Sequence, residues 1–289
     1  MDISHHSTIL FSCLTFLLFL PSSKPISDYS TLVYKTCATQ TFNHQLSQSY
    51  SQTLYSLFQQ LISQSSHHKF FKTMELVNDD TAISGLFQCR DDISKEDCFT
   101  CVNLLPHMSN TLCSDSTSAR VQLHGCYIQY YTDQKLTERS DYQSKSSNML
   151  HKVCGEPSVA YDDKFRELMD EAFVALESEI RNSDGYYSMN YKSVKLMAQC
   201  AGDSEACECS KCVSNAVQVV MEECASSLSA QIYFDECFVS YTYQPELDGV
   251  PRNSVPGASR NNTTEKLAAI VVGGAAALFL GFILLSMLN

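Results

Sequence analysis

The sequence is poor in glycine and in positive charge. It holds 10 glycines in 289 residues and has no Gly-Lys-Ser or Gly-Lys-Thr step, so a phosphate-binding loop of that type is excluded. Lysine and arginine number 20 against 32 aspartates and glutamates, which gives a formal net charge of −12. A surface of that sign repels phosphate backbones, and we therefore expect no nucleic-acid partner.

A recognisable catalytic or metal-binding constellation is also missing. The acidic clusters at 91–97 and 222–223 fall on polar helix or loop faces, where carboxylates are ordinarily solvated. His67 and His68 stand in a Ser/Gln-rich stretch without a third ligand or a nucleophile at a recognisable spacing. We therefore expect a protein that is not an enzyme and that needs neither a metal nor a cofactor.

The first apolar segment lies near the amino terminus. Ile9–Leu20 is a twelve-residue apolar run, preceded by no Lys or Arg and followed by Pro21-Ser22-Ser23. This run is too short to span a bilayer, but it has the length of the hydrophobic region of a signal peptide. We assign residues 1–27 to a signal peptide rather than to a buried helix, because nothing around the run is amphipathic.

The second apolar segment ends the chain. Leu267–Leu288 contains 22 residues without a charge, which is enough to cross roughly 30 Å of hydrocarbon. With a cleaved signal peptide, this segment predicts a single-span type I membrane protein whose residues 28–266 face the cell exterior. Small residues at i, i+4 spacing would let a second helix approach closely, so we expect homo- or hetero-oligomers through this helix. These residues are Ala269, Gly273, Ala277 and Gly281.

A glycosylphosphatidylinositol signal is the alternative for this end of the chain. Gly257-Ala258-Ser259 followed by a polar spacer fits such a signal, although the apolar run is longer than is typical. In either case residues 244–266 form a stalk rich in Pro, Gly, Asn and Ser, beyond the last cysteine. The stalk carries two overlapping glycosylation sequons, which begin at Asn261 and Asn262.

Between the two ends, the chain contains an internal repeat. The stretches "CRDDISKEDCFTC" (89–101) and "CAGDSEACECSKC" (200–212) are separated by 111 residues, and the offset holds for five cysteines in a row. Cys37 and Cys154 add a sixth cysteine upstream of each set. We therefore predict two cysteine-rich domains, 28–132 and 151–243, joined by a polar connector at 133–150. The matched cysteines are 89, 98, 101, 113 and 126 in the first repeat and 200, 209, 212, 224 and 237 in the second.

Three interpretations compete for these cysteines. A zinc site usually needs two close pairs, and each repeat has only one C-x2-C; a thioredoxin-like dithiol needs a neighbouring βαβ pattern, which is missing. An even number per repeat behind a signal peptide favours disulfides formed in an oxidising compartment. Direct Cys98–Cys101 and Cys209–Cys212 bonds are disfavoured, because Cβ atoms at i, i+3 on a helix are about 5 to 6 Å apart. The other pairings stay open.

Cys207 has no counterpart in the first repeat, where Glu96 takes its place. Three fates are compatible with its position: a free, partly buried thiol, an alternative partner for Cys200, or a link to a second chain.

The apolar spacing predicts an α+β fold. A helical stripe opens each repeat, and a second helix is expected to begin near Ser94, with Asp97 at the capping-box distance, and to recur at about 205–224. Segments 70–77, 82–89, 120–131, 191–200 and 231–243 have the composition of strands, so each repeat should hold a largely antiparallel sheet. The stripes are Leu46, Tyr50, Leu54, Leu57, Phe58 and Leu61, then Phe165, Leu168, Met169, Ala172, Phe173, Leu176 and Ile180.

The C-x8-C-x2-C-x11-C-x12-C pattern, present twice, resembles the domain shared by ginkbilobin-type antifungal lectins and plant cysteine-rich receptor-like kinases. Two such domains before a transmembrane segment, without a kinase, are similar to the plasmodesmata-located protein family. The resemblance implies two helices on an antiparallel sheet of about five strands in each domain. It also implies the disulfides Cys37–Cys113, Cys89–Cys98, Cys101–Cys126, Cys154–Cys224, Cys200–Cys209 and Cys212–Cys237, which leave Cys207 unpaired.

For function, the resemblance implies a plasma-membrane protein at plasmodesmata that modulates cell-to-cell trafficking through callose-linked permeability. It further implies receptor kinases, viral movement proteins or wall glycans as partners. The competing prediction is a wall-facing carbohydrate-binding or antifungal defence protein with a lipid anchor.

The lectin site of this resemblance is mostly absent. The mannose-binding lectins place an Asn directly after the first of the six cysteines, an Arg seven residues after the fifth, and a Glu five residues after the sixth. The first repeat has Ala38, Arg120 and Tyr131 at these places, and the second has Gly155, Gln231 and Thr242. Arg120 alone matches, so it is the one candidate carbohydrate-binding residue; the alternative is an ordinary arginine on the surface of a strand.

Overall fold

The computed structural model describes residues 28–39, 47–114, 116–134, 148–157 and 163–244, all of which lie in one compact unit. The predicted signal peptide, most of the connector, the stalk after Gln244 and the apolar segment 267–288 lie outside the described residues. Asn261, Asn262 and the four small residues of that segment are therefore not placed. Within the described ranges, no helix is both long and apolar enough to span a membrane.

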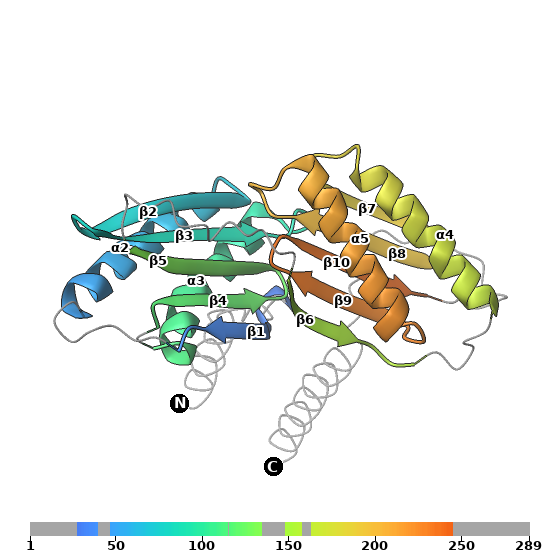
Figure 1. Cartoon of the computed structure of the whole chain (residues 1–289), viewed down its shortest axis with the longest axis horizontal. Helices are drawn as coiled ribbons and strands as arrows, with labels where there is room; N and C mark the ends of the chain where they lie inside the picture. Colours follow the sequence, from blue (N-terminus) through green and yellow to red (C-terminus); the bar gives the residue numbers. More distant parts are fainter. Residues whose placement is uncertain (1–27, 40–46, 115, 135–147, 158–162, 245–289) are drawn as a thin grey trace, which may run out of the picture. The chain divides into compact units, whose positions relative to one another are not determined.

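The two repeats follow the same order of elements (Figure 1). The first contains η1 (Asp28–Ser30), β1 (Leu32–Cys37), α2 (Ser47–Ser65), β2 (Phe70–Asn78), β3 (Thr81–Cys89), α3 (Lys95–Leu112), β4 (Ser118–Leu123) and β5 (Cys126–Gln134). The second contains β6 (Met149–Cys154), α4 (Asp163–Ile180), β7 (Tyr186–Tyr191), β8 (Val194–Cys200), α5 (Ala206–Glu223), β9 (Ser229–Phe234) and β10 (Cys237–Tyr243).

Each repeat is one five-stranded antiparallel sheet covered by two helices. The strand orders are β1-β4-β5-β3-β2 and β6-β9-β10-β8-β7, which is the same topology twice. Figure 1 shows α4 and α5 side by side across one face of the second sheet. The predicted α+β class, with two helices and about five strands in each repeat, is confirmed.

The predicted strands need correction. The single extended segment expected at 120–131 is two strands, β4 and β5, which pair with each other on either side of His124 and Gly125. The segment 231–243 divides in the same way into β9 and β10. The connections, His124-Gly125 and Asp235-Glu236, are only two residues long, which is too short to divide each segment into two separate runs of strand composition, so both turns were missed. The edge strands β1 and β6 and most of β7 were not predicted.

Apart from Leu46, which lies outside the described residues, the predicted helical stripes pack into the two cores. Leu57, Phe58 and Leu61 of α2 are at most 2% exposed, and Ala172, Phe173 and Leu176 of α4 are equally buried. Phe58 packs edge-on against Tyr130, and Phe173 packs edge-on against Tyr241, with ring centroids 5.7 Å apart in both cases. Since Tyr130 and Tyr241 are themselves separated by the repeat offset, these contacts align α2 with α4 residue by residue.

The predicted start of α3 is confirmed. The Ser94 hydroxyl accepts a hydrogen bond from the Asp97 backbone N–H at 3.0 Å and donates one to the Asp97 carboxylate at 2.7 Å. This arrangement satisfies a backbone donor that the first turn of a helix otherwise leaves unpaired. The helix then places Cys98 and Cys101 on its buried face, toward the sheet.

Candidate functional site

Twelve of the described cysteines are joined in six disulfides. None of the six joins Cys98 to Cys101 or Cys209 to Cys212, and the Cα–Cα distances of 5.3 to 6.1 Å are ordinary for disulfides. The bonds are Cys37–Cys113, Cys89–Cys98, Cys101–Cys126, Cys154–Cys224, Cys200–Cys209 and Cys212–Cys237, the pairs that the resemblance implies.

All six bonds lie within a repeat. In each repeat one bond ties the first strand to the end of the second helix, and two bonds tie the start of that helix to the sheet. Domains of this size bury a limited core, so such bonds contribute substantially to stability. Cys207, in the first turn of α5, is exposed and unpaired in the structure.

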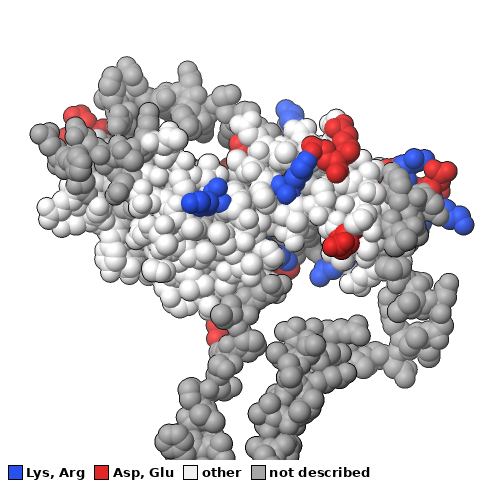
Figure 2. Space-filling model, turned by 90° about the horizontal axis from the view of Figure 1, so that it is seen from below, with Lys and Arg blue, Asp and Glu red and all other residues white. Residues whose placement is uncertain are grey.

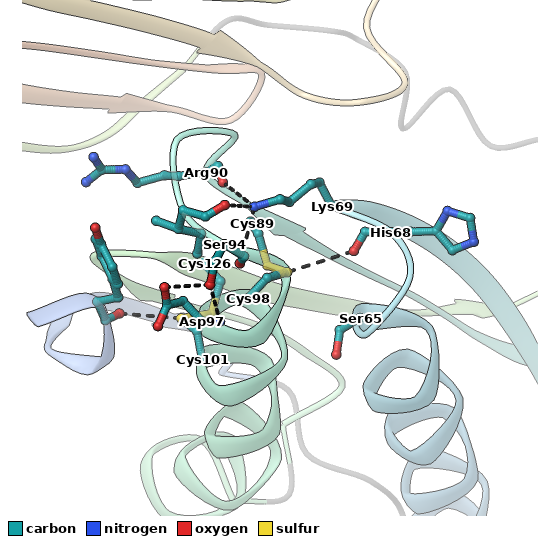
Figure 3. The surroundings of a disulfide bond; sticks show 12 residues. Ser65, His68, Lys69, Cys89, Arg90, Ser94, Asp97, Cys98, Cys101 and Cys126 are labelled. Atoms are coloured by element: carbon teal, nitrogen blue, oxygen red, sulfur yellow. Dashed lines mark hydrogen bonds between the residues drawn. A yellow bond between two sulfur atoms is a disulfide. The ribbon is translucent and has the colours of Figure 1, made fainter. Parts of the chain in front are cut away.

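A lysine secures the turn beside the Cys89–Cys98 bond (Figure 3). The Lys69 ammonium donates to the backbone carbonyls of Arg90 at 3.3 Å, Ser94 at 3.4 Å and Ile93. Burial lowers the pKa of this amine, and the nearby carboxylates of the turn oppose that shift. The contacts fix the chain between the end of β3 and the start of α3, which is where the two repeats meet.

The contact between the two repeats, here called the joint, is made by equivalent residues from each side. The Gln88 side-chain amide donates to the carbonyl of Cys200 at 2.8 Å, and the Gln199 amide donates to the carbonyl of Cys89 at 3.0 Å. Both the donors and the acceptors are related by the repeat offset of 111. Each repeat therefore presents the same patch to the other, as the subunits of a twofold dimer do.

Aromatic rings continue this symmetry at the edge strands. Tyr34 of β1 stacks on His151 of β6, its counterpart in the second repeat, with centroids 5.2 Å apart. Tyr34 also meets Tyr233 edge-on at 5.6 Å, and Tyr233 packs against Phe238 at 4.6 Å. Desolvation by burial raises the pKa of Tyr34 and of Tyr233, so both phenols stay protonated at neutral pH.

Arg120 lies inside this joint. Its guanidinium is 3.8 Å from the centre of the Tyr127 ring, and it donates to Gln129 at 3.2 Å and to the carbonyl of Asp235 at 3.3 Å. The residue is 8% exposed, so the interpretation of Arg120 as a surface arginine is wrong. It is a strand residue, but it connects the two repeats. Carbohydrate binding at Arg120 stays a prediction.

An open cavity of about 440 Å³, including the solvent at its mouth, lies at the joint. Arg90 and Arg120 line it from the first repeat, and Asp235 and Glu236 from the second, so the two walls differ in charge. Burial raises the pKa of the Asp235 carboxyl, which Arg120 and a backbone N–H of Asn148 oppose. The cysteines that line the cavity are in disulfides and cannot act as nucleophiles.

The acidic clusters and the histidine pair do not come together. Within the described residues, no three His, Cys, Asp or Glu side chains are grouped so that they could hold a metal ion. Asp92 forms an ion pair with Arg90 at 2.6 Å, and the Asp97 carboxylate accepts a hydrogen bond from the Ser94 hydroxyl at 2.7 Å. These carboxylates therefore have structural partners.

Comparison with known proteins decides the family. The family model described as "Salt stress response/antifungal" matches residues 36–133 and 131–244, one match for each repeat. Plasmodesmata-located protein 2 of Arabidopsis thaliana is 38% identical over 100% of this chain and 95% of its own length. Plasmodesmata-located protein 4 of the same plant is 35% identical over 91% of this chain and 89% of its own length.

The chain belongs to the plasmodesmata-located protein family. Solved structures of the family share its fold. The tandem DUF26 ectodomain of the cysteine-rich receptor-like protein PDLP8 from Arabidopsis thaliana superposes with a TM-score of 0.64 at 24% identity, covering 75% of this chain and 100% of that one. The corresponding ectodomain of PDLP5 gives a TM-score of 0.63 at 22% identity, covering 74% of this chain and 100% of that one.

The joint between the two repeats was not predicted. Gln88 and Gln199 each precede the cysteine that ends an almost continuously buried strand, and a glutamine at such a position does not by itself indicate a contact with the other repeat. The signal available was the identity of the two positions across the repeat, because polar residues retained at one offset are candidates for a shared contact.

Proposed function

We propose that this chain is a non-catalytic type I membrane protein of plasmodesmata that modulates cell-to-cell passage. The supporting observation is the 38% identity to plasmodesmata-located protein 2, which extends over the whole chain and so includes both apolar ends. Plasmodesmata-located protein 1 adds a third relative, 32% identical over 94% of this chain.

The proposed topology follows from the sulfur chemistry and the two ends. Six disulfides need an oxidising compartment, which the cytosol does not provide. A cleaved signal peptide at 1–27 would deliver residues 28–266 to the cell exterior, and the uncharged segment 267–288 would hold them at the membrane.

In this proposal the ectodomain acts as an adaptor. The described cavity walls offer arginines, amides and carboxylates but no free thiol, and the joint presents both repeats as one body. Receptor kinases and viral movement proteins are the proposed partners, and callose-linked permeability is the proposed output.

Localisation tests the proposal directly. A fluorescent protein fused after Asn289, produced in leaf epidermis, should mark puncta at walls shared by two cells. Movement of a small fluorescent tracer between cells should change when the chain is overproduced. A uniform plasma-membrane signal together with unchanged tracer movement would reject the proposal.

The mode of anchoring has its own test. We expect phosphatidylinositol-specific phospholipase C to leave the protein in the membrane fraction, because the proposed apolar helix is retained. Release by the enzyme would show that the anchor is a lipid and not a transmembrane helix, and it would favour the alternative of a wall-facing defence protein.

The row of small residues in the proposed span has a matched test. Gly273→Leu places a branched side chain in the row and should weaken lateral association or targeting to puncta. Leu278→Ile, a change outside the row, serves as the control. Equal behaviour of the two variants in cross-linking and in imaging would leave the row without a role.

A further inference from the structure

Helices α2 and α4 occupy the same place in their repeats but present opposite chemistry to solvent. The alignment through Phe58 and Phe173 matches each residue of α2 with the residue 115 positions later in α4. α2 contains no Asp, Glu, Lys or Arg in 19 residues, whereas α4 contains eight in 18. In Figure 2 most of the visible charged side chains likewise lie on the half of the molecule that holds the second repeat.

The difference holds position by position on the exposed face. Four exposed residues of α2 follow one face at spacings of four, three and four, and charged residues take three of their places in α4. Tyr55, which is 66% exposed, corresponds to Asp170. The residues of this α2 face are Gln48, Gln52, Tyr55 and Gln59, and their α4 counterparts are Asp163, Glu167, Asp170 and Val174.

The fold does not require a neutral face at this place. α4 packs on its sheet with the same buried stripe while it carries charges outward, so charges at these positions are compatible with the architecture. The neutral stretch is also longer than the helix, since residues 36–68 contain no charged side chain. At the 18% charged composition of the chain, 33 residues would contain about six.

The polar groups of the α2 face are not used inside the protein. No hydrogen bond or ion pair joins the side chains of Gln52, Tyr55 or Gln59 to another residue in the described parts of the chain. The charges of α4 are used locally, because Arg166 pairs with Asp163 and Glu171 accepts from Lys192 and Tyr191. The amides and the ring of the α2 face are therefore left to an external ligand or to water.

We propose that the α2 face of Gln48, Gln52, Tyr55 and Gln59 binds an uncharged polysaccharide chain. A primary amide offers two donors and an acceptor, which match sugar hydroxyls, and an exposed tyrosine ring offers an apolar surface for the C–H face of a pyranose. The four residues extend along about 16 Å of the helix, which suits an extended polymer better than a compact molecule.

Other partner classes fit this face less well. An acidic polymer would be repelled by the net charge of −12, and the α2 face has no cation to hold it. A protein partner usually requires a cluster of apolar residues at the centre of the interface, and here a single aromatic residue stands among amides. This inference rests on the proposed extracellular location of the ectodomain.

The test is depletion of the purified full chain from solution by insoluble polysaccharides. The chain is held in a detergent without a sugar headgroup and mixed with particles of a linear β-glucan, of cellulose, or of a polygalacturonate gel. We expect depletion by a neutral glucan, no depletion by polygalacturonate, and the same apparent Kd in 0.05 and 0.5 M NaCl, because no charge takes part.

Matched variants separate the α2 face from the rest of the protein. Gln52→Ala combined with Tyr55→Ala should weaken depletion at least tenfold, whereas Tyr55→Phe, which keeps the ring, should retain most of it. Glu167→Ala combined with Asp170→Ala, the counterpart change in α4, should leave it unaltered. Thermal unfolding of each variant verifies that it is folded, as expected for exposed helical positions.

Four outcomes would overturn the proposal. The first is that neither neutral polymer depletes the protein, and the second is that depletion disappears in high salt. The third is that the α2 and α4 variants are depleted equally, and the fourth is that the α2 variants keep glucan binding but lose binding to a protein partner. Imaging the same variants distinguishes this failure from that of the proposed function. Puncta that persist without glucan binding would reject the glycan site alone, and glucan binding without puncta would reject the plasmodesmal role alone.

Discussion

The two repeats have nearly the same core, but they differ in the segments that lead into their second helices. Both bury a stripe of one helix against a five-stranded sheet, and both place three disulfides at equivalent positions. They differ in how the second helix begins. Ser94 caps α3 and Lys69 holds the turn before it, whereas Glu205 forms no capping hydrogen bond and Gly185 occupies the place of Lys69.

This difference shows which features both repeats share and which features only one of them has. The cysteines and the apolar stripe are enough to build each repeat, because the second repeat has the same fold without the Lys69 contacts and the Ser94 cap of the first. Gly185 adopts a φ of 87°, a conformation in which glycine has no side-chain penalty, so its turn closes by backbone geometry instead of by a lysine. Local devices can therefore vary while the architecture stays.

The largest expected effect comes from removing equivalent disulfides. Replacing Cys101 and Cys126 by Ala should cost about 3 kcal/mol of unfolding free energy, and the same change at Cys212 and Cys237 should cost a similar amount, because each closes a loop of the same length. Calorimetry of the two variants provides the comparison. A loss below about 1 kcal/mol in one repeat would show that its native bond is not structural.

The next effect concerns the joint. A Cβ added at Gly202 would stand 2.3 Å from Cγ of Phe70, so Gly202→Ala should destabilise the molecule by about 1 to 3 kcal/mol through overpacking. Hydrogen exchange should increase at the amides of the joint. Asp91→Ala, at the corresponding position of the first repeat, is the control. If the steric explanation holds, Gly202→Ala added to Phe70→Ala should cost little more than Phe70→Ala alone.

The helix caps give a smaller and opposite pair of effects. Ser94→Ala should remove about 1 kcal/mol of stability, because the backbone N–H of Asp97 loses its acceptor. Glu205→Ser should add roughly 0.5 to 1 kcal/mol by giving α5 the cap that it lacks. Urea unfolding measures both. Destabilisation by Glu205→Ser would mean that the backbone before α5 cannot use a capping hydroxyl.

The smallest effect is expected for the ion pair that crosses the joint. Lys72 and Asp203 are 2.9 Å apart, but both side chains are 45% exposed, so a double-mutant cycle with Ala should give a coupling of about 0.5 kcal/mol that weakens with salt. Arg90 and Asp92, which form two hydrogen bonds within the first repeat, should couple more strongly. A larger coupling energy for Lys72 and Asp203 than for Arg90 and Asp92 would show that this ion pair contributes substantially to holding the repeats together.

Features with a periodic or paired signal were predictable from the sequence. The cysteine offset indicated two domains, the apolar spacing indicated α2 and α4, and the separation of Ser94 from Asp97 located the start of α3. Each of these signals is local in the chain, and it depends on residue types that have few other roles at such spacing.

Features that depend on contacts between residues distant in the sequence were not predictable. Arg120 sits in a strand like many surface arginines, and only the position of Tyr127 and of the Asp235 carbonyl explains its burial. The turn at His124 and Gly125 was missed because the connection is only two residues long and the strands on both sides of it are buried, so the two strands read as one extended segment. Tertiary contacts decided both cases, and a single sequence contains no direct record of them.

The absence of sulfur bridges between the repeats has a mechanical consequence. Every described cysteine except Cys207 is bonded within its own repeat, while amide hydrogen bonds, stacked rings and an exposed ion pair join the repeats to each other. Tension applied across the ectodomain would therefore separate two intact bodies before it unravelled either one. Such a molecule would yield at a defined weak point and could close again once the load was removed.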